Sequence, residues 1–458
     1  MTLNKGDVIE CGVESLALGG RGVARVDGMA VFVAGAIPGQ RVRARIEKAK
    51  KRFAEAVTEE VLIPSPHQRE PFCPHFGVCG GCMHQQLAVE EQLRQKDEQV
   101  RQALARLGGV EFAEFLPPTP SPESRWYRNK MEFHFEGFGG EKLHLGLKES
   151  GPEGRVVDVT SCFLLSETAV AVVNAAREYC RETGAAAYDP RRNVGFWRHL
   201  VVRHVGRADG AGQVLVHCIT GTERREYPHA KGLGKHLRSR FPEIASFVHS
   251  TRRSRRTLVF GERTEAVLGK AYVEERLGDI RYRISPDSFF QTNTAGAERL
   301  FGLVRELAGL TGAEHVYDLY CGGGGIALFL ADRAASVFGV EFSEQAVEDA
   351  AANTTRNALT NCEFAQADLG MFGGVFAGRP APDVVVCDPP RTGMDEPVIE
   401  ELLRLAPKRI VAVSCNPATL ARDVARLAEA YAPLKAGCVD LFPHTPHVEC
   451  VAQLERRG

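Results

Sequence analysis

The sequence predicts an α/β protein in three parts: an OB-like β-barrel over 1–62, a mixed α+β region over 63–285, and a Rossmann-like sheet over 286–458. Short runs of alternating apolar and polar residues, punctuated by glycines, predict the barrel. Proline-rich breaks follow at 64–66 and 116–122. From residue 297 onward, helical stretches alternate with short β-branched strands, which is typical of a parallel sheet covered by helices.

The charge of the chain is distributed unevenly. The 458 residues carry a net charge of −1, but residues 287–458 have a net of −9 and residues 1–286 a net of +8. This division suggests two binding partners of different kinds. There is no apolar run long enough to span a membrane and no signal-like start, and the odd number of cysteines, 13, favours a reducing compartment. We expect a cytoplasmic monomer without a membrane partner.

One strand of the predicted barrel is strongly basic. Residues 41–52 contain seven Lys or Arg and one Glu. Such a strand can hold a nucleic-acid backbone, but lysines also protect the exposed edge of a sheet, and the two interpretations are evenly matched from this segment alone.

Acidic and glycine-rich positions in the C-terminal part predict a nucleoside site. Asp318 ends a strand and leads into a glycine turn that includes Gly325. Glu341 and Asp368 are expected to end the next two strands, where carboxylates can take ribose hydroxyls and an adenine amino group. Since the glycine turn has no basic residue for a phosphate, the pattern favours S-adenosylmethionine over NAD.

The following strand ends suggest the reaction. Asp388-Pro-Pro also occurs in methyltransferases that act on exocyclic amines, so it is ambiguous alone. Cys415 ends the next predicted strand and is better placed for catalysis than Cys387 or Cys321. Carbon 5 of uracil becomes nucleophilic only after a thiolate adds to carbon 6, and a base such as Glu449 must then remove the carbon-5 proton. Amine methylation needs no such cysteine.

These motifs resemble the RNA 5-methyluridine methyltransferases over nearly the whole chain. The matching segments are 285–293, 318–322, 388–391, 414–417 and 447–449. The resemblance implies Cys415 as nucleophile and Glu449 as base. It implies donor binding by Gln291, Tyr320, Glu341, Asp388 and, in the ribosomal branch, Asp368. It also makes the N-terminal barrel similar to a TRAM module, which binds RNA. The chain departs from the family at Gly323 and Gly325, where many members carry Asn.

A compact thiol cluster, Cys73-x5-Cys79-x2-Cys82, lies in the central region. From the residues alone it fits zinc, with His75 or His84 as additional ligands, or an iron–sulfur cluster. The resemblance implies a 4Fe-4S cluster whose fourth ligand is Cys162. Radical enzymes that use S-adenosylmethionine leave one iron open on three cysteines, so four ligands favour a structural or RNA-contacting cluster.

Three further clusters mix guanidinium and aromatic groups and are candidates for RNA contact: 125–130, 191–192 with 197–199, and 252–256. A solvated charged face explains each cluster equally well, and only their joint location in the +8 segment favours RNA contact. The sequence as a whole predicts an S-adenosylmethionine-dependent enzyme that methylates carbon 5 of a uridine, with 23S rRNA as the expected substrate. The alternatives are a tRNA uridine-C5 methyltransferase and a non-catalytic RNA-binding iron–sulfur protein.

Overall fold

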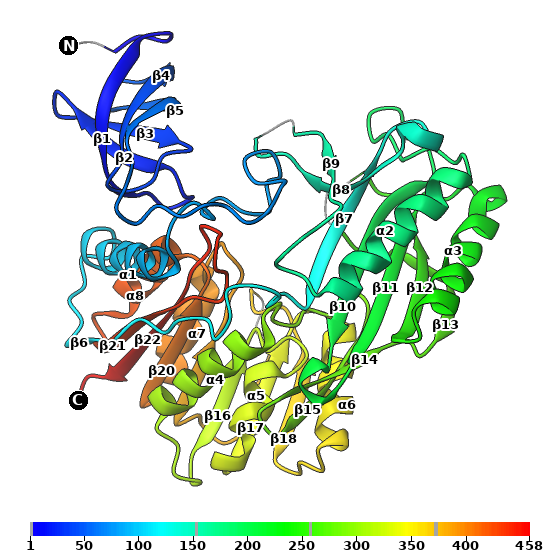
Figure 1. The fold of residues 1–458 in the computed structure, drawn as a ribbon. Helices are drawn as coiled ribbons and strands as arrows, with labels where there is room; N and C mark the ends of the chain where they lie inside the picture. The colour runs from blue at the N-terminus through cyan, green and yellow to red at the C-terminus, as the bar shows by residue number, and fades with distance from the viewer. Residues whose placement is uncertain (1–2, 152–153, 256–258, 371–373) are drawn as a thin grey trace.

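The computed structural model describes residues 3–151, 154–255, 259–370 and 374–458. A barrel lies at one end of the molecule, and two larger sheets with their helices make up the rest (Figure 1). Within the described residues, no helix is long and apolar enough to cross a bilayer.

The N-terminal strands close into a barrel in the order β1-β2-β3-β5-β4. Their bounds are β1 Val8–Leu16, β2 Gly22–Val26, β3 Met29–Ala34, β4 Arg41–Ala49 and β5 Phe53–Ile63. Alternate side chains such as Val31, Val33 and Ile46 point inward and are at most 1% exposed. The alternation of apolar and polar residues in the sequence therefore gives each strand one buried face and one face toward solvent.

The central part is a seven-stranded sheet in the order β13-β12-β11-β10-β7-β8-β9. Helices α2 and α3 cover one of its faces (Figure 1). The bounds are β7 Lys130–Glu136, β8 His144–Lys148, β9 Val156–Asp158, α2 Glu167–Glu182, β10 Trp197–Val205, β11 Gln213–Thr220, α3 Tyr227–Arg240, β12 Ile244–Thr251 and β13 Arg263–Gly269. A two-stranded hairpin follows, β14 Val273–Leu277 and β15 Ile280–Ile284.

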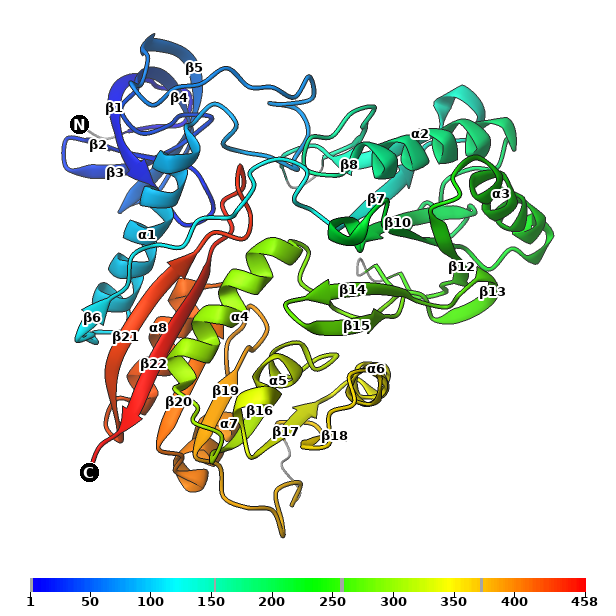
Figure 2. The ribbon, with the colours of Figure 1, turned by 60° about the horizontal axis from the view of Figure 1, so that its bottom comes forward.

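The C-terminal sheet has eight strands in the order β18-β17-β16-β19-β20-β22-β21-β6 (Figure 2). Its elements are α4 Thr294–Ala308, β16 His315–Leu319, α5 Gly325–Leu330, β17 Ser336–Glu341, α6 Glu344–Arg356, β18 Cys362–Gln366, β19 Val384–Cys387, α7 Glu396–Leu405, β20 Arg409–Ser414, α8 Pro417–Leu427, β21 Tyr431–Val439 and β22 Glu449–Arg456. The first five strands in this order are parallel, and β22 runs antiparallel to both neighbours. The predicted Rossmann-like class is confirmed.

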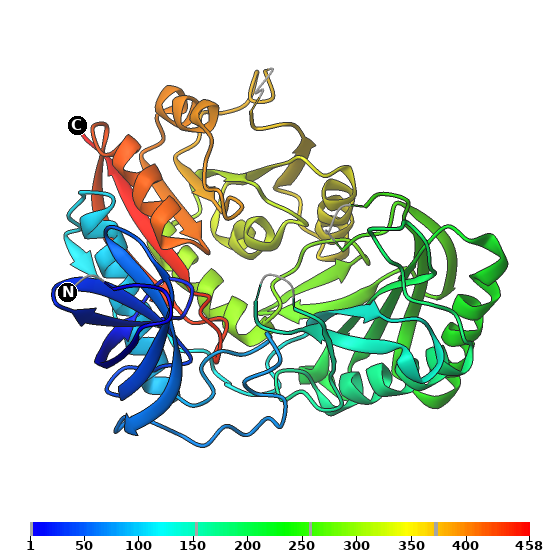
Figure 3. The ribbon, with the colours of Figure 1, turned by 90° about the horizontal axis from the view of Figure 1, so that it is seen from above.

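Two elements from the middle of the chain belong to this sheet rather than to the central one. Helix α1, Val89–Arg106, packs on α8 and β21, and the short strand β6, Glu114–Phe115, pairs with β21. Buried Lys96 of α1 forms an ion pair with buried Asp440 at 2.7 Å. Helix α1 also binds the barrel, since Gln95 accepts a hydrogen bond from the Leu16 backbone N–H at 2.8 Å. It thus joins the barrel to the C-terminal part (Figure 3).

Candidate active site and cysteine cluster

A cavity of about 890 Å³ lies at the carboxyl edge of the parallel strands. This is the edge at which doubly wound sheets bind ligands. Seven of the eight residues predicted for donor binding and catalysis line the cavity: Gln291, Tyr320, Gly325, Glu341, Asp388, Cys415 and Glu449. The structure therefore brings together residues that are up to 158 positions apart in the sequence.

The glycine turn after β16 is held by two carboxylates. Asp318, which is 1% exposed, accepts the Ala327 N–H at 2.9 Å, and Glu341 accepts the Gly322 N–H at 3.1 Å. Gly322 and Gly324 have φ of +53° and +81°, which side chains with a Cβ rarely adopt. The glycine turn and Glu341 both line the cavity.

The electrostatics of this cavity suit a cation. Burial, followed by repulsion from Asp388 and Glu341, raises the pKa of Asp318 well above its usual value. Burial raises the pKa of Asp388 to about 6. A bound positive charge would favour the ionised form of each group, so these two carboxyl groups are compatible with a cationic ligand.

Asp368 is placed differently from the other predicted residues. Strand β18 ends at Gln366, so the prediction that it runs to residue 368 is wrong. The Asp368 side chain is exposed, accepts the Gly370 N–H at 2.8 Å and does not line the described cavity. A short polar side chain that binds its own backbone two residues on favours a turn over a strand. Residues 371–373, which follow, lie outside the described residues.

Sequence reasoning missed how the 285–293 segment is fixed over the cavity. Asp349 of α6, which is 1% exposed, accepts hydrogen bonds from the Ser285 hydroxyl at 2.8 Å and from the Ser288 hydroxyl. Asn353, one turn later, donates to the Gly323 carbonyl at 3.3 Å. Asp349 and Asn353 are polar residues at positions i and i+4 of one helix and are both buried. This spacing is the sequence signal that could have indicated that α6 holds the 285–293 segment.

Cys415 directly follows strand β20, and Glu449 begins the neighbouring antiparallel strand β22. Ser414 of β20 is paired with Cys450 of β22. Cys415, which follows Ser414, therefore adjoins Glu449, which precedes Cys450. Burial, and then repulsion from Glu449, raises the pKa of the Cys415 thiol. Burial, and then Asp388, raises the pKa of Glu449 well above its usual value. The positive charge of Arg391 acts in the opposite direction on both groups.

The position of Arg391 depends on His447. The guanidinium donates to His447 Nδ1 at 3.1 Å. Burial, and then the charge of Arg391, lowers the pKa of His447 to about 4, so at neutral pH its ring is uncharged and can accept this bond. The arginine backbone is also held, because the Asn416 side chain donates to its carbonyl at 3.1 Å. Arg391 is thereby fixed beside the thiol and the carboxylate.

The loop before Glu449 rests on the cysteine-bearing segment. His444, which has a φ of +67°, offers its carbonyl to the backbone N–H groups of Met83 and His84 at 2.8 and 3.1 Å. Gln92 accepts the His444 N–H at 2.7 Å. His84 Nε2 reaches the Gly20 carbonyl of the barrel at 3.0 Å. The barrel, the cysteine segment and the active-site loop therefore meet at one place.

The four predicted cluster ligands, Cys73, Cys79, Cys82 and Cys162, line one small cavity. Burial raises the pKa of Cys82 to about 12 and also raises those of Cys79 and Cys162, with a further contribution from mutual repulsion. The Gly81 N–H donates to Cys79 Sγ at 3.4 Å. Thiols so buried ionise only if a positive charge compensates them, as a metal does.

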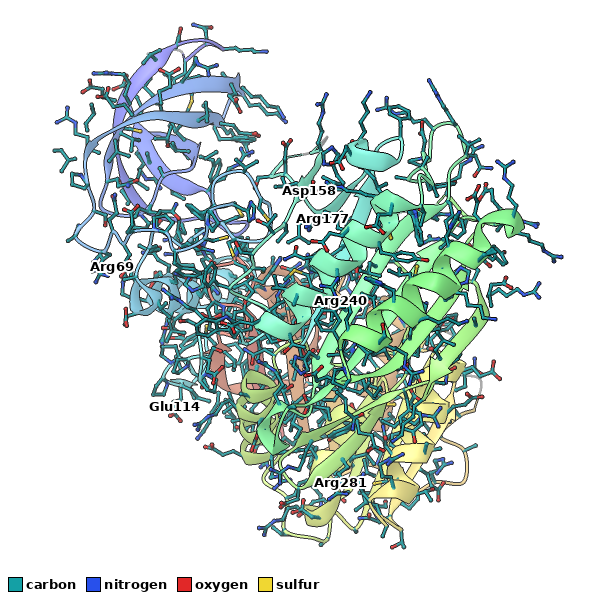
Figure 4. All side chains as sticks on the ribbon, turned by 45° about the vertical axis from the view of Figure 1, so that its right-hand side comes forward. Arg69, Glu114, Asp158, Arg177, Arg240 and Arg281 are labelled. Atoms are coloured by element: carbon teal, nitrogen blue, oxygen red, sulfur yellow. The ribbon has the colours of Figure 1, made fainter. Side chains whose placement is uncertain are left out.

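The segment that carries Cys162 is anchored on α2. Buried Arg177 donates to the Val159 carbonyl at 2.6 Å and forms an ion pair with Asp158 at 3.2 Å (Figure 4). Within the described residues, no three His, Cys, Asp or Glu side chains are arranged to hold a single metal ion. His84 Nε2 bonds to the barrel, and His75 Nε2 accepts the Thr160 N–H at 3.2 Å.

Several residues of the basic clusters predicted to contact RNA are buried. Trp197, Arg198 and Arg252 are at most 4% exposed, so they belong to the interior of the central part. Trp126 is 39% exposed, and Arg125 stacks over the Phe72 ring at 3.9 Å. Residue 256, the last of the third cluster, lies outside the described residues.

Arginines of the basic strand form ion pairs with glutamates of the barrel. Arg43 pairs with Glu60 and with Glu10, and Arg45 pairs with Glu59 at 2.6 Å. These pairs are exposed, so each stabilises the barrel by about 1 kcal/mol or less.

Comparison with known proteins agrees with this geometry. A family model described as tRNA (Uracil-5-)-methyltransferase matches residues 248–457, and a TRAM domain model matches residues 3–58. An uncharacterized RNA methyltransferase of Nitratidesulfovibrio vulgaris is 44% identical over 460 residues, which cover 100% of this chain and 97% of the relative. The chain belongs to the RNA uracil-5-methyltransferase family. It is an RNA methyltransferase that uses S-adenosylmethionine, as the family and the cavity indicate.

Two other matches extend over the whole chain. An uncharacterized RNA methyltransferase of Halalkalibacterium halodurans is 36% identical and covers 100% of this chain and 98% of the relative. The crystal structure of Pyrococcus abyssi tRNA (uracil-54, C5)-methyltransferase in complex with S-adenosyl-L-homocysteine superimposes with a TM-score of 0.76 and 29% identity. It covers 97% of this chain and 100% of that one. The barrel, the central sheet and the Rossmann-like sheet are therefore shared with a solved uracil methyltransferase.

Proposed function

We propose that the protein methylates carbon 5 of a uridine in RNA, with Cys415 as the nucleophile and Glu449 as the base. The observation that carries the proposal is the joint placement of this thiol, just after β20, and this carboxylate, at the start of the paired strand β22, in one cavity with the residues predicted to bind the donor. Methylation of an exocyclic amine would use Asp388 and its prolines but would need neither group.

In this mechanism the chain supplies four functions. Gln291, Tyr320, Glu341 and Asp388 bind the donor, and Asp368 is retained as a prediction for the adenine end. Cys415 adds to carbon 6, so that carbon 5 carries the electron pair that forms the new bond to the donor methyl group. Glu449 then takes the carbon-5 proton, and the Cys415–carbon 6 bond breaks as the double bond re-forms. Arg391 offsets the negative charge at both groups.

We propose 23S rRNA as the substrate, because the chain combines a TRAM barrel with the four-cysteine cavity, as in the ribosomal branch that the sequence resembles. A transfer RNA is the second candidate, and it is favoured by the likeness to a solved enzyme named for tRNA over 97% of this chain. We also propose that Cys73, Cys79, Cys82 and Cys162 hold a 4Fe-4S cluster. When bound, it would supply positive charge that ionises the buried thiols and would brace the segment that supports His444.

The substrate can be identified by mapping 5-methyluridine in ribosomal and transfer RNA from a strain that lacks the gene. Loss of the modification at a 23S rRNA position, restored by the wild-type gene but not by Cys415→Ala, is the expected result. Loss confined to tRNA would select the second candidate, and an unchanged map in both RNAs would contradict the proposed reaction.

A further inference from the structure

A second cavity of about 600 Å³ adjoins the cofactor cavity and shares Arg128 and Thr292 with it. Lys130, Glu132 and His134, alternate residues of β7, line this second cavity from one face of the central sheet. The cysteine segment at Gly80–Met83 and the end of β8 with the residues after it complete the lining. In Figures 1 and 2, the segment after β5 runs from the barrel to the ends of β7 and β8.

Arg128 stands where the two cavities meet, and its backbone is fixed from both sides. It forms isolated β-bridges with Leu165, three residues after Cys162, and with Asn293, at the end of the segment that covers the cofactor cavity. Its guanidinium carbon lies 5.7 Å from the centre of the Phe442 ring. The side chain is therefore held between the cysteine cluster and the active-site loop.

The Arg128 guanidinium has an unpartnered donor, although its charge partly offsets the burial that raises the pKa of the Cys162 thiol. Its Nε is buried and has no hydrogen-bond partner, and among the described residues no carboxylate forms an ion pair with its guanidinium. Lys130, in contrast, is paired with Glu132 at 2.7 Å. A buried donor without a partner costs about 1–3 kcal/mol, so its presence between two cavities points to a ligand that supplies the acceptor.

The second cavity also offers a flat neutral ring. His134 Nδ1 lies 3.1 Å from Nδ1 of His199, and the two rings meet edge to face. Burial lowers the pKa of both histidines, that of His199 to about 3, so the pair is uncharged at neutral pH. An uncharged imidazole can stack on a nucleobase or bond to its edge.

We propose that the second cavity binds the nucleotide adjacent to the target uridine, with Arg128 on the phosphodiester between the two nucleotides and His134 against the neighbouring base. This inference rests on the proposed function, since it takes the uridine in the first cavity as given. The phosphodiester supplies the acceptor that the buried Nε of Arg128 lacks, and the His134 ring supplies an uncharged surface for the neighbouring base. The enzyme thus reads one base beside its target and holds that base in place during methylation.

The test uses the full-length enzyme and a short RNA that contains the uridine found by the mapping above. Arg128→Gln should lower kcat/KM for this RNA by about tenfold or more, because a hydrogen bond to a charged group has that effect. It should also reduce the slope of log binding affinity against log salt by about one phosphate. Arg240→Gln is the control, since Arg240 lies on α3 and pairs with Glu178 away from both cavities (Figure 4). The dissociation constant for S-adenosylhomocysteine, measured by calorimetry, reports whether Arg128→Gln is folded, and Arg128→Lys should restore the salt slope.

Replacement of a flanking base by an abasic ribose tests the second contact. On one side of the uridine this change should lower kcat/KM for the wild type, and it should have little further effect in His134→Ala. Equal losses in wild type and His134→Ala, or an Arg128→Gln variant that behaves like Arg240→Gln, would overturn the inference. Failure of the wild type to methylate any RNA would instead refute the proposed function. Salt-dependent filter binding of the same RNA would then still compare Arg128→Gln with Arg240→Gln.

Discussion

Replacement of Lys96 by Met should destabilise the C-terminal part by about 3–5 kcal/mol, the range for one partner removed from a buried ion pair. The side chains of Lys96 and Asp440 are 4% and 2% exposed and lie 2.7 Å apart, so Lys96→Met leaves a carboxylate without its counter-charge in the interior. The lysine also donates to the Phe442 carbonyl at 3.0 Å, so the loop that leads to Glu449 loses a second contact. Activity should fall together with stability.

The assay is urea unfolding followed by circular dichroism, using the transition that S-adenosylhomocysteine shifts upward, since a ligand stabilises the part that binds it. Lys408→Met is a matched control. Lys408 pairs with Asp383 at 2.9 Å but is 84% exposed, so solvent screens this pair and its loss should change stability little. Lys96→Met/Asp440→Asn should recover part of the lost stability because it removes the stranded charge. Equal effects of Lys96→Met and Lys408→Met would refute the reasoning.

Three further predictions follow from the site. Glu449→Gln should accumulate a protein–RNA adduct that survives denaturing electrophoresis, since without the base the carbon-5 proton stays and Cys415 cannot leave; absence of the adduct would count against Glu449 as the base. Burial raises the pKa of Cys415 above the 9.0 of a free thiol. The rate of its alkylation by iodoacetamide, measured by mass spectrometry, should therefore keep rising above pH 9, and Arg391→Gln should move this pH profile to higher pH. A profile centred below pH 9 would contradict this. Anaerobically purified protein should be brown and contain about four iron and four sulfide ions per chain. Cys82→Ser should lose iron, while the control Cys11→Ser in the barrel should retain it. Stoichiometric zinc without iron would overturn the proposed cluster.

Local patterns predicted most of the architecture and most of the residues that line the first cavity. The strands expected before Asp318, Glu341 and Asp388 are present, because their signals lie within single elements. The barrel and the Rossmann-like sheet follow from periods of two and from βα alternation in the same way.

Contacts between distant segments could not be predicted in this way. Nothing local to Lys96 or Arg128 shows that one meets Asp440 and the other lies between two cavities. Arginine and tryptophan near residue 198 look like an RNA-binding surface in the sequence, but burial against neighbouring strands places them in the interior. The sequence pattern places Asp368 at the end of a strand, but the strand ends two residues earlier. The turn that follows is held by one side-chain hydrogen bond, which the pattern of apolar residues does not reveal.

The central claim is that the methyl group replaces the hydrogen on carbon 5 of uracil through a Cys415 adduct. The most direct measurement is release of tritium to water from RNA labelled at carbon 5 of its uridines, with methyl transfer followed in the same reaction. One tritium should be released for each methyl group transferred, and Cys415→Ala should show neither event. Methyl transfer without tritium release, or tritium release that persists in Cys415→Ala, would contradict the mechanism.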